Sequence, residues 1–214
     1  LIQIDLSMPQ QGLTFKKINK VKKWRLKDSE VPTIQLDLGV HLISILKFLI
    51  PNIKIKKAIS NETRINNKNL VHSVNSWLIT KDKILCKLSV SKYILGQRNG
   101  LSLTINGTKG SFAWKQVDPE KLIFFDNNGK NIIFDRNDKE LKISNQKRYN
   151  RYVVGHPYGF IESIGNYYFD IYNSLISKSK RTEYILNLND EKFIFQILNL
   201  LKLSSLRKKW ITNK

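Results

Sequence analysis

Residues 71–93, VHSVNSWLITKDKILCKLSVSKY, decide the expected fold of this 214-residue chain. Apolar and polar side chains alternate through 71–80 and again through 84–93, which is the pattern of half-buried strands. The three residues between them, Lys81-Asp82-Lys83, make a tight connection. The sequence therefore predicts a β-hairpin here.

Further short strands are expected on both sides of this hairpin. Asn106-Gly107 and Asn127-Asn128-Gly129 are strong turn sequences between some of them. Because neighbouring strands joined by short turns run in opposite directions, much of the sheet should be antiparallel. The expected strands are 1–7, 53–60, 101–105, 111–114, 122–125, 132–134 and 141–143.

Three segments have helical spacing of apolar residues: 37–49, which Pro51 ends, 160–175, and 193–206 after a cap candidate at Asn189. The order of strand, helix, many strands and helices predicts one α+β domain over residues 1–214. We expect a mostly antiparallel mixed β-sheet with helices packed on one face. The other face is left for solvent or for a partner.

The composition limits the classes of protein to consider. Lys and Arg number 37 against 17 Asp and Glu, a formal charge of +20. This charge favours a nucleic-acid partner or a polyanionic or phosphorylated small substrate. However, the basic residues are spread along a chain rich in Lys, Ile and Asn, as AT-rich coding would give. They are dense only at 16–27 and 207–214, and no helix-turn-helix, zinc-finger or single-strand-binding signature accompanies them. We therefore expect no nucleic-acid partner.

The chain also lacks the sequence signals of other compartments. No apolar run is long enough to span a membrane, and no signal peptide opens the sequence. The single cysteine, Cys86, excludes an internal disulfide and fits the reducing cytoplasm, where we place the protein. Three histidines and this cysteine are scattered without metal-ligand spacing, so no metal site is expected.

Asp37 and His41 are four residues apart and fall on one face of the expected helix. A carboxylate beside an imidazole on a rigid element is suited to moving protons near neutral pH. The same spacing also occurs in surface and capping interactions, so the spacing alone does not distinguish a proton-transfer pair from these structural roles.

Three ordered segments together resemble one family, the C-terminal domain of the glucose–fructose oxidoreductase / inositol dehydrogenase / MocA oxidoreductases. They are Asp37-x-Gly39-x-His41 before an apolar helix, residues 103–114 (LTINGTKGSFAW), and residues 155–162 (GHPYGFIE) with Asn166-Tyr167. The resemblance covers about residues 1–210. It departs from the family at 31–35 (VPTIQ), where many members have small glycines, and this departure could reshape the substrate pocket.

The resemblance implies hydride transfer between a sugar or polyol and NAD or NADP. His41 would be the acid/base of the reaction. Asp37 would bind a substrate hydroxyl or orient the imidazole, and Gly39 would allow close approach. Arg25, His156 and Tyr158 are candidate substrate-binding residues; each has an equally plain structural reading, as surface charge, turn or packing.

The family's N-terminal dinucleotide-binding domain has no counterpart in these residues, because the sequence holds neither Gly-x-Gly-x-x-Gly nor Glu-Lys-Pro. The first residue, Leu1, also suggests a piece of a longer oxidoreductase. We therefore expect no cofactor-binding residues, no tight NAD(P) binding and no turnover from this fragment alone. The resemblance further implies a homo-oligomer through the open sheet face.

Two other readings stay open. The chain could be a non-catalytic interaction or scaffold domain that keeps the fold, which the altered run at 31–35 favours. A basic nucleic-acid-associated domain is the weakest reading, because charge alone favours it. The sugar, the choice of NAD or NADP and the oligomer size do not follow from the sequence.

Overall fold

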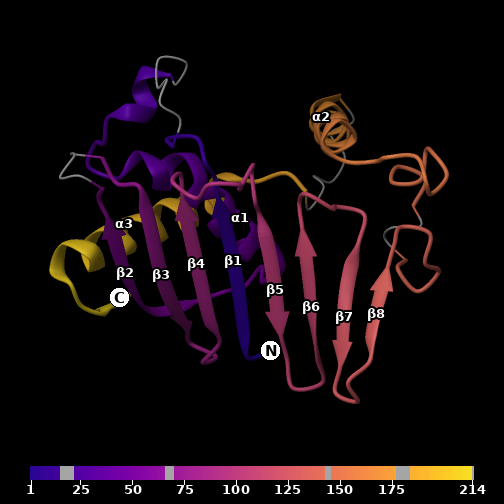
Figure 1. Ribbon diagram of the computed structural model, residues 1–214, viewed down its shortest axis with the longest axis horizontal. Coiled ribbons are helices and arrows are strands. Elements are labelled where there is room, and N and C mark those ends of the chain that lie inside the picture. Colours follow the sequence, from indigo (N-terminus) through magenta and orange to yellow (C-terminus); the bar gives the residue numbers. More distant parts are fainter. Residues whose placement is uncertain (15–21, 66–69, 143–145, 177–183, 214) are drawn as a thin grey trace.

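One sheet of nine strands organises the structure, a computed structural model that describes residues 1–14, 22–65, 70–142, 146–176 and 184–213 (Figure 1). Its strand order is β8-β7-β6-β5-β1-β4-β3-β2-β9. The strands are β1 Gln3–Pro9, β2 Ile55–Thr63, β3 Ser73–Thr80, β4 Leu85–Ser91, β5 Ser102–Asn106, β6 Gly110–Lys115, β7 Leu122–Asp126, β8 Asn131–Phe134 and β9 Ile211–Thr212.

Strand β1 joins two antiparallel halves of this sheet. It runs parallel to β4, with Ile4 opposite Cys86, and antiparallel to β5, with Ile4 opposite Ile105. All other neighbouring strands in the described part of the chain are antiparallel. The predicted α+β fold with a mixed, mostly antiparallel sheet is therefore confirmed, including the hairpin β3–β4 at 71–93.

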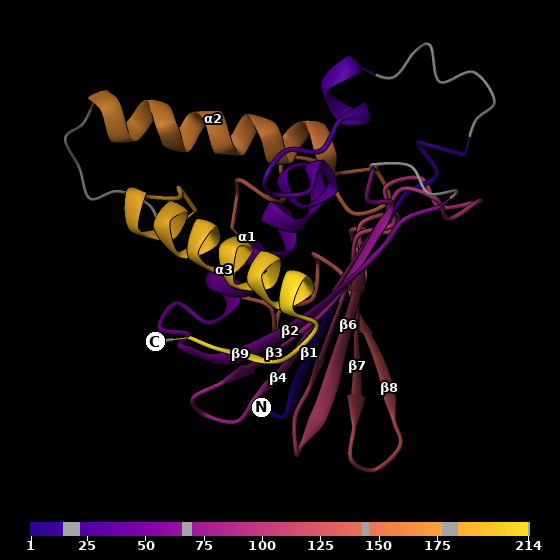
Figure 2. The same ribbon diagram turned by 90° about the vertical axis from the view of Figure 1, so that its left-hand side faces the viewer.

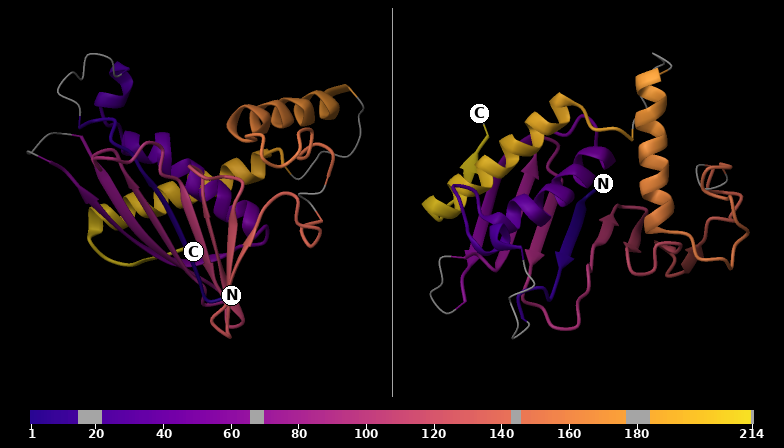
Figure 3. Two further views of the ribbon diagram at one scale, coloured as in Figure 1. Left: turned by 45° about the vertical axis from the view of Figure 1, so that its right-hand side comes forward. Right: turned by 90° about the horizontal axis from the view of Figure 1, so that it is seen from above.

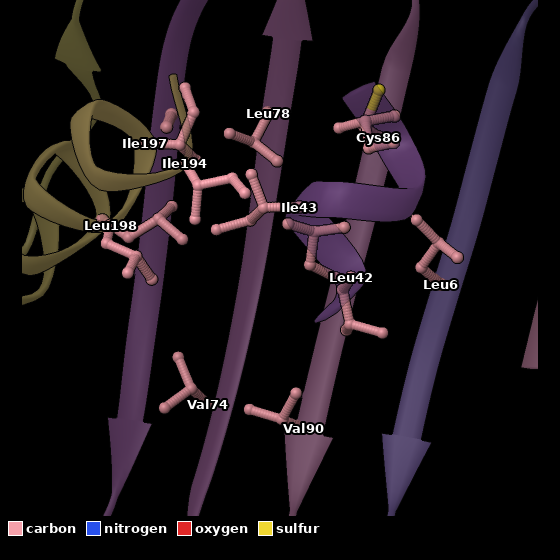
Figure 4. Packing of buried hydrophobic residues seen from close by; sticks show 14 of the residues in the cluster. Leu6, Leu42, Ile43, Val74, Leu78, Cys86, Val90, Ile194, Ile197 and Leu198 are labelled. Carbon is pink, nitrogen blue, oxygen red and sulfur yellow. The ribbon is translucent and has the colours of Figure 1, made fainter. Parts of the chain in front are cut away.

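Helices α1 (Val40–Leu49) and α3 (Leu188–Arg207) cover one face of the half that contains β1, β4, β3 and β2 (Figure 2). Alternate strand residues point at these helices and form the core with them (Figure 4). Burying each such side chain contributes about 1.5–3 kcal/mol. Fully buried members from the sheet and the two helices are Leu6, Val74, Leu78, Cys86, Leu42, Ile43, Ile194 and Leu198.

Helix α2 (Phe160–Ile176) does not join this core. Figures 1 and 3 show it standing off the sheet, beside the ends of the strands rather than on their face. Its buried residues are polar, Asn166 and Asp170. The spacing at 160–175 predicted this helix correctly, but its apolar side does not pack on the sheet as α1 and α3 do.

The second face of the sheet carries no helix (Figure 2). The strand register places Trp77 of β3, Phe125 of β7 and Ile133 of β8 on this face, and all three are exposed. Polar residues such as Asp5 and Lys87 alternate with the core residues and share the same side. The face is therefore mixed, with several large apolar groups open to solvent.

Three local predictions differ from the structure. The strand expected at 141–143 is wrong for 141–142, which form a loop and a turn, and 143 lies outside the described residues. The two-residue strand β9 was not predicted, because two residues carry no periodicity. The N-cap of helix α3 is Asn187, two residues before the expected cap Asn189, since Asn187 accepts hydrogen bonds from the Asn189 and Asp190 N–H groups.

In the described part of the chain, no helix combines the length and the apolar composition that crossing a membrane requires.

Candidate active site

The segment that carries Asp37 begins as a π-helical turn, Gln35–Gly39, which continues directly into α1. The N–H groups of Gln35 and Leu36 both donate to the carbonyl of Pro32, which fixes the start of the turn. A Cβ at Gly39 would stand 2.1 Å from the buried Gln35 Oε1. The close approach expected at Gly39 is therefore made by Gln35, and wide turns of this kind are frequent at functional sites.

Both carboxylate oxygens of Asp37 are held by cations. Lys92 Nζ donates to Oδ2 at 2.5 Å and Arg25 Nη2 donates to Oδ1 at 3.0 Å. The Asp37 side chain is 12% exposed and that of Lys92 only 5%. Burial alone would raise the pKa of Asp37, but the bonds from Lys92 and Arg25 outweigh it and hold the pKa below its ordinary value. Asp37 is thus an anion at neutral pH, and its lowered pKa makes it a weak base.

His41 stands in the first turn of α1 and is exposed. Asp37, four residues earlier, bonds to Arg25 and Lys92 rather than to this imidazole. Both side chains nevertheless line the same cavity, so the expected face is shared. The arrangement separates two tasks: Asp37 fixes the two cations, while the His41 imidazole is left accessible from the cavity.

This cavity of about 450 Å³ brings together residues from distant parts of the chain. Its side-chain amides and hydroxyl offer both donors and acceptors of hydrogen bonds, and its floor is apolar. Two of the amides also bond each other, since Gln10 Nε2 donates to Asn99 Oδ1. The lining residues are Met8, Gln10, Arg25, Asp37, Leu38, His41, Ser44, Ile45, Asn99, Leu101, Gln116 and Phe160.

The predicted substrate-binding residues are divided between two places. Arg25 lines the cavity of Asp37 and His41, with its guanidinium also 4.9 Å from the Trp24 ring centre. Tyr158 lines a separate cavity of about 420 Å³, where its hydroxyl donates to the carbonyl of Arg148. His156 is exposed and lines neither cavity; its carbonyl accepts a hydrogen bond from Arg136. The structure thus groups Arg25, but neither Tyr158 nor His156, with Asp37 and His41.

The second cavity has a mostly apolar wall, and its Arg136 and Glu120 side chains already form hydrogen bonds. Arg136 is buried and donates to Glu120 and to the carbonyls of Tyr152, Val153 and His156. Because these bonds tie the loop before α2 to the sheet, Arg136 has a structural role here. Tyr158 belongs to the same tie through its N–H, which donates to Glu120.

Sequence reasoning missed Lys92 and the three amides of Gln10, Asn99 and Gln116. A signal for Lys92 was present: Cys86, Leu88 and Val90 alternate inward along β4, and the same alternation continues to Lys92. A lysine at an inward position requires a counter-charge. The amides carried no signal, because loops that are far apart in sequence bring them together.

Cys86 is a core residue rather than a nucleophile. Burial, with a smaller contribution from the Asp5 carboxylate, raises the pKa of its thiol to about 12. The thiol therefore stays protonated at neutral pH. Within the described residues, no three His, Cys, Asp or Glu side chains gather closely enough to hold a metal ion.

Comparison with solved structures shows this fold in several oxidoreductases. An oxidoreductase from Sinorhizobium meliloti matches with a TM-score of 0.76 and 19% identity over 98% of this chain and 56% of its own. An inositol dehydrogenase homolog from Azotobacter vinelandii, complexed with NADH and myo-inositol, matches with a TM-score of 0.78 and 14% identity over 99% and 57%. Levoglucosan dehydrogenase, in complex with NADH and L-sorbose, gives 0.74 and 11% over 99% and 58%.

The chain thus spans little more than half the length of these structures. At such low identity the likeness establishes the fold alone. No curated protein sequence matches the chain. The family model described as "Oxidoreductase family, C-terminal alpha/beta domain", of the Gfo/Idh/MocA group, matches residues 12–192. That match covers most of the chain and confirms the resemblance seen in the sequence: the chain belongs to the Gfo/Idh/MocA oxidoreductase family, as its C-terminal α/β domain.

Proposed function

We propose that this chain is the substrate-binding domain of an NAD(P)-dependent oxidoreductase that interconverts an alcohol and a carbonyl on a sugar or polyol. The observation that carries the proposal is the cavity in which an accessible imidazole, His41, lies among amide side chains and the Asp37 group of charges. Family membership supports the reaction type, and the bound inositol and sorbose of two structural relatives support the substrate class.

In this proposal the chain's own residues bind the substrate and move one proton. Removing a hydride from a carbinol carbon requires that its hydroxyl lose a proton, and His41 is placed to accept it. The amides of Gln10, Asn99 and Gln116 would bind the remaining hydroxyls. Arg25 would stay fixed by Asp37, so that its cavity-facing charge is available to an oxygen of the substrate.

We do not assign the binding of the dinucleotide to these 214 residues. The sequence has no Gly-x-Gly-x-x-Gly, the turn that lets a backbone approach the pyrophosphate. When bound beside the cavity by another domain, a nicotinamide would accept the hydride. We therefore expect the 214-residue chain to bind NAD(H) and NADP(H) only weakly and to show no turnover alone.

The proposal is tested with the complete product of the gene, assayed for NAD(P)H formation on a panel of inositols, hexoses and acidic sugars. We expect at least one of these alcohols to be oxidised with either NAD or NADP. The 214-residue chain serves as the control and should be inactive with every pair. If the complete product reduces neither dinucleotide across the panel, the scaffold reading replaces this one.

We also propose that the open face of the sheet joins two copies of the chain. Support comes from the exposed Trp77, Phe125 and Ile133 on a face that no helix covers. Large apolar groups gathered on one face are typical of a protein interface. In a dimer with twofold symmetry, the open face of each copy would pack against the open face of the other, so both would be buried.

Replacing Trp77 by Glu is expected to convert the oligomer to a monomer, because the substitution puts a charge in place of a large apolar side chain of the proposed interface. The measurement is light scattering coupled to gel filtration over a range of concentrations. Leu206→Glu is the matched control: Leu206 is also exposed, but it lies on α3, on the other side of the sheet. A wild-type chain that remains monomeric at all concentrations contradicts the proposal.

A further inference from the structure

The cavity of Asp37 and His41 has more positive than negative charge in its wall. Asp37 is the one acidic side chain among the described residues that line it, and its carboxylate binds two cations, Arg25 and Lys92. The lowered pKa of Asp37 keeps this carboxylate ionised at neutral pH. The three groups together therefore carry one net positive charge, and the neutral imidazole that accepts a proton adds none.

Of the two cations, Arg25 is the one that faces a ligand. The Lys92 side chain is only 5% exposed and is not part of the cavity wall. Because a buried ammonium depends on its counter-charge, the Asp37 carboxylate is committed to Lys92. Arg25 does line the cavity, and its side chain is 41% exposed. The excess charge is therefore presented to the cavity by the Arg25 guanidinium.

The Arg25 guanidinium is held in position but still has free hydrogen-bond donors. Its Nη2 donates to Asp37 Oδ1, and the group lies over the Trp24 ring, 4.9 Å from the ring centre. Within the described part of the chain, its Nε and Nη1 atoms have no hydrogen-bond partner, and solvent does not reach Nε. Unpaired donors of this kind destabilise the protein, and an acceptor oxygen of a ligand would remove that cost.

A neutral sugar would leave this charge without compensation. When a bound substrate displaces water from the cavity, the guanidinium loses solvation that hydroxyl groups replace only in part. A carboxylate supplies both the missing negative charge and the acceptor oxygens, and the planar guanidinium matches its geometry. Its single charge equals the excess in the cavity wall, whereas a phosphate monoester carries nearly two negative charges at neutral pH. The charge therefore favours a carboxylate.

We propose that Arg25 selects an acidic substrate, a sugar or polyol that carries one carboxylate in addition to the hydroxyl that reacts. This inference rests on the function proposed above and names the substrate class of the same site. The carboxylate would bind Arg25 and take no part in the bond changes, while the reacting hydroxyl lies at His41. Binding at two separate groups would fix which hydroxyl reaches the imidazole. The myo-inositol and L-sorbose bound by two structural relatives are neutral, so the proposed class differs from theirs.

Matched pairs of substrates test the selectivity in the complete product of the gene. D-Glucuronate and D-galacturonate differ from D-glucose and D-galactose only at the terminal carbon, where a carboxylate replaces a hydroxymethyl group. We expect kcat/KM for at least one uronate to exceed that for its hexose by about 10- to 100-fold, the range of a hydrogen bond to a charged group. An equal or higher kcat/KM for the hexose in both pairs overturns the proposal. A preference for the hexose phosphates over the uronates also overturns it.

Substitutions of Arg25 assign the selectivity to its guanidinium. Arg25→Met should lower kcat/KM for the uronate about 10- to 100-fold more than for the hexose. Arg25→Lys keeps the charge without the planar fork and should retain part of the preference. The matched control is Arg64→Met, which should leave the preference unchanged, because Arg64 is 47% exposed and pairs with Glu62 outside this cavity. An equal loss for uronate and hexose in Arg25→Met overturns the proposal, since Arg25 would then only support the site. Circular dichroism verifies that each variant is folded.

Binding measurements separate this inference from the proposed reaction. Calorimetry on the complete product with NADH gives the affinities for the same uronates and hexoses. Tighter binding of a uronate that is lost in Arg25→Met, without turnover of any sugar or polyol, supports the substrate class and contradicts the reaction. Turnover of neutral sugars or polyols alone supports the reaction and contradicts selection by Arg25. If no uronate binds more tightly than its hexose, the inference is wrong whatever the turnover.

Discussion

Replacing Asp37 by Ala is expected to lower the free energy of unfolding of the chain by about 3–5 kcal/mol, because it leaves a buried ammonium without its counter-charge. Lys92 is almost fully buried, and its recorded partner is the Asp37 carboxylate. Arg25 is more exposed and can turn to water, so its loss of Asp37 adds less. The measurement is urea unfolding followed by fluorescence and circular dichroism.

The matched variant is Lys92→Met, which has a similar length and no charge. It is expected to cost less than Asp37→Ala, because Asp37 keeps its bond from Arg25 and is nearer to solvent. The double variant Asp37→Ala/Lys92→Met should be more stable than Asp37→Ala, which gives a coupling energy between the two sites. If the two single effects simply add, the pair does not stabilise the fold in this way.

The stability of the wild-type chain should also depend on pH through Asp37. Its pKa is below the ordinary value of 3.8, because the bonds from Lys92 and Arg25 outweigh the opposing effect of burial. The pair therefore contributes fully above that value, and the contribution is lost as the pH falls through the lowered pKa. In Asp37→Asn this part of the acid destabilisation should be absent. The free energies of unfolding of the wild type and of this variant, measured as a function of pH, should therefore converge at low pH.

The sequence predicted the elements whose side chains repeat with a clear period. Residues 71–93 formed the expected hairpin, since inward positions such as Val74, Leu78 and Cys86 pack on the helices. Strand β9 is too short to show a period, and residues 141–142, where an apolar leucine precedes a lysine, do not join the sheet.

Helix α2 shows the limit of reading a period. Spacing gives the width and direction of an apolar stripe on the helix, but not which body the stripe faces. The burial of Asn166 and Asp170 could not be predicted from the helix alone, because it depends on hydrogen bonds from Arg148 in a separate loop. For the same reason, the sequence brought Asp37 and His41 together but not Lys92, which reaches Asp37 from the end of β4.

Replacing His41 by Ala is expected to lower the turnover of the complete product by about 10²- to 10⁴-fold, the usual contribution of a positioned acid/base. The reason is geometric: His41 is exposed into the cavity, and Asp37 is unable to substitute because its oxygens are occupied and its pKa is low. Since His41 is exposed, its loss should change the stability of the fold by less than about 0.5 kcal/mol. Turnover and urea unfolding, measured on the same preparation, distinguish a chemical effect from a folding effect.

Added imidazole distinguishes an acid/base role from a purely steric one. In His41→Ala the truncated side chain leaves space at the cavity wall, and free imidazole should restore part of the lost turnover in proportion to its neutral form. Phe48→Ala is the matched control, because Phe48 is also exposed on α1 but lies outside the cavity. Its turnover should stay within about twofold of wild type and should not respond to imidazole. Unchanged turnover in His41→Ala would remove the imidazole from the reaction and leave the cavity as a binding site only.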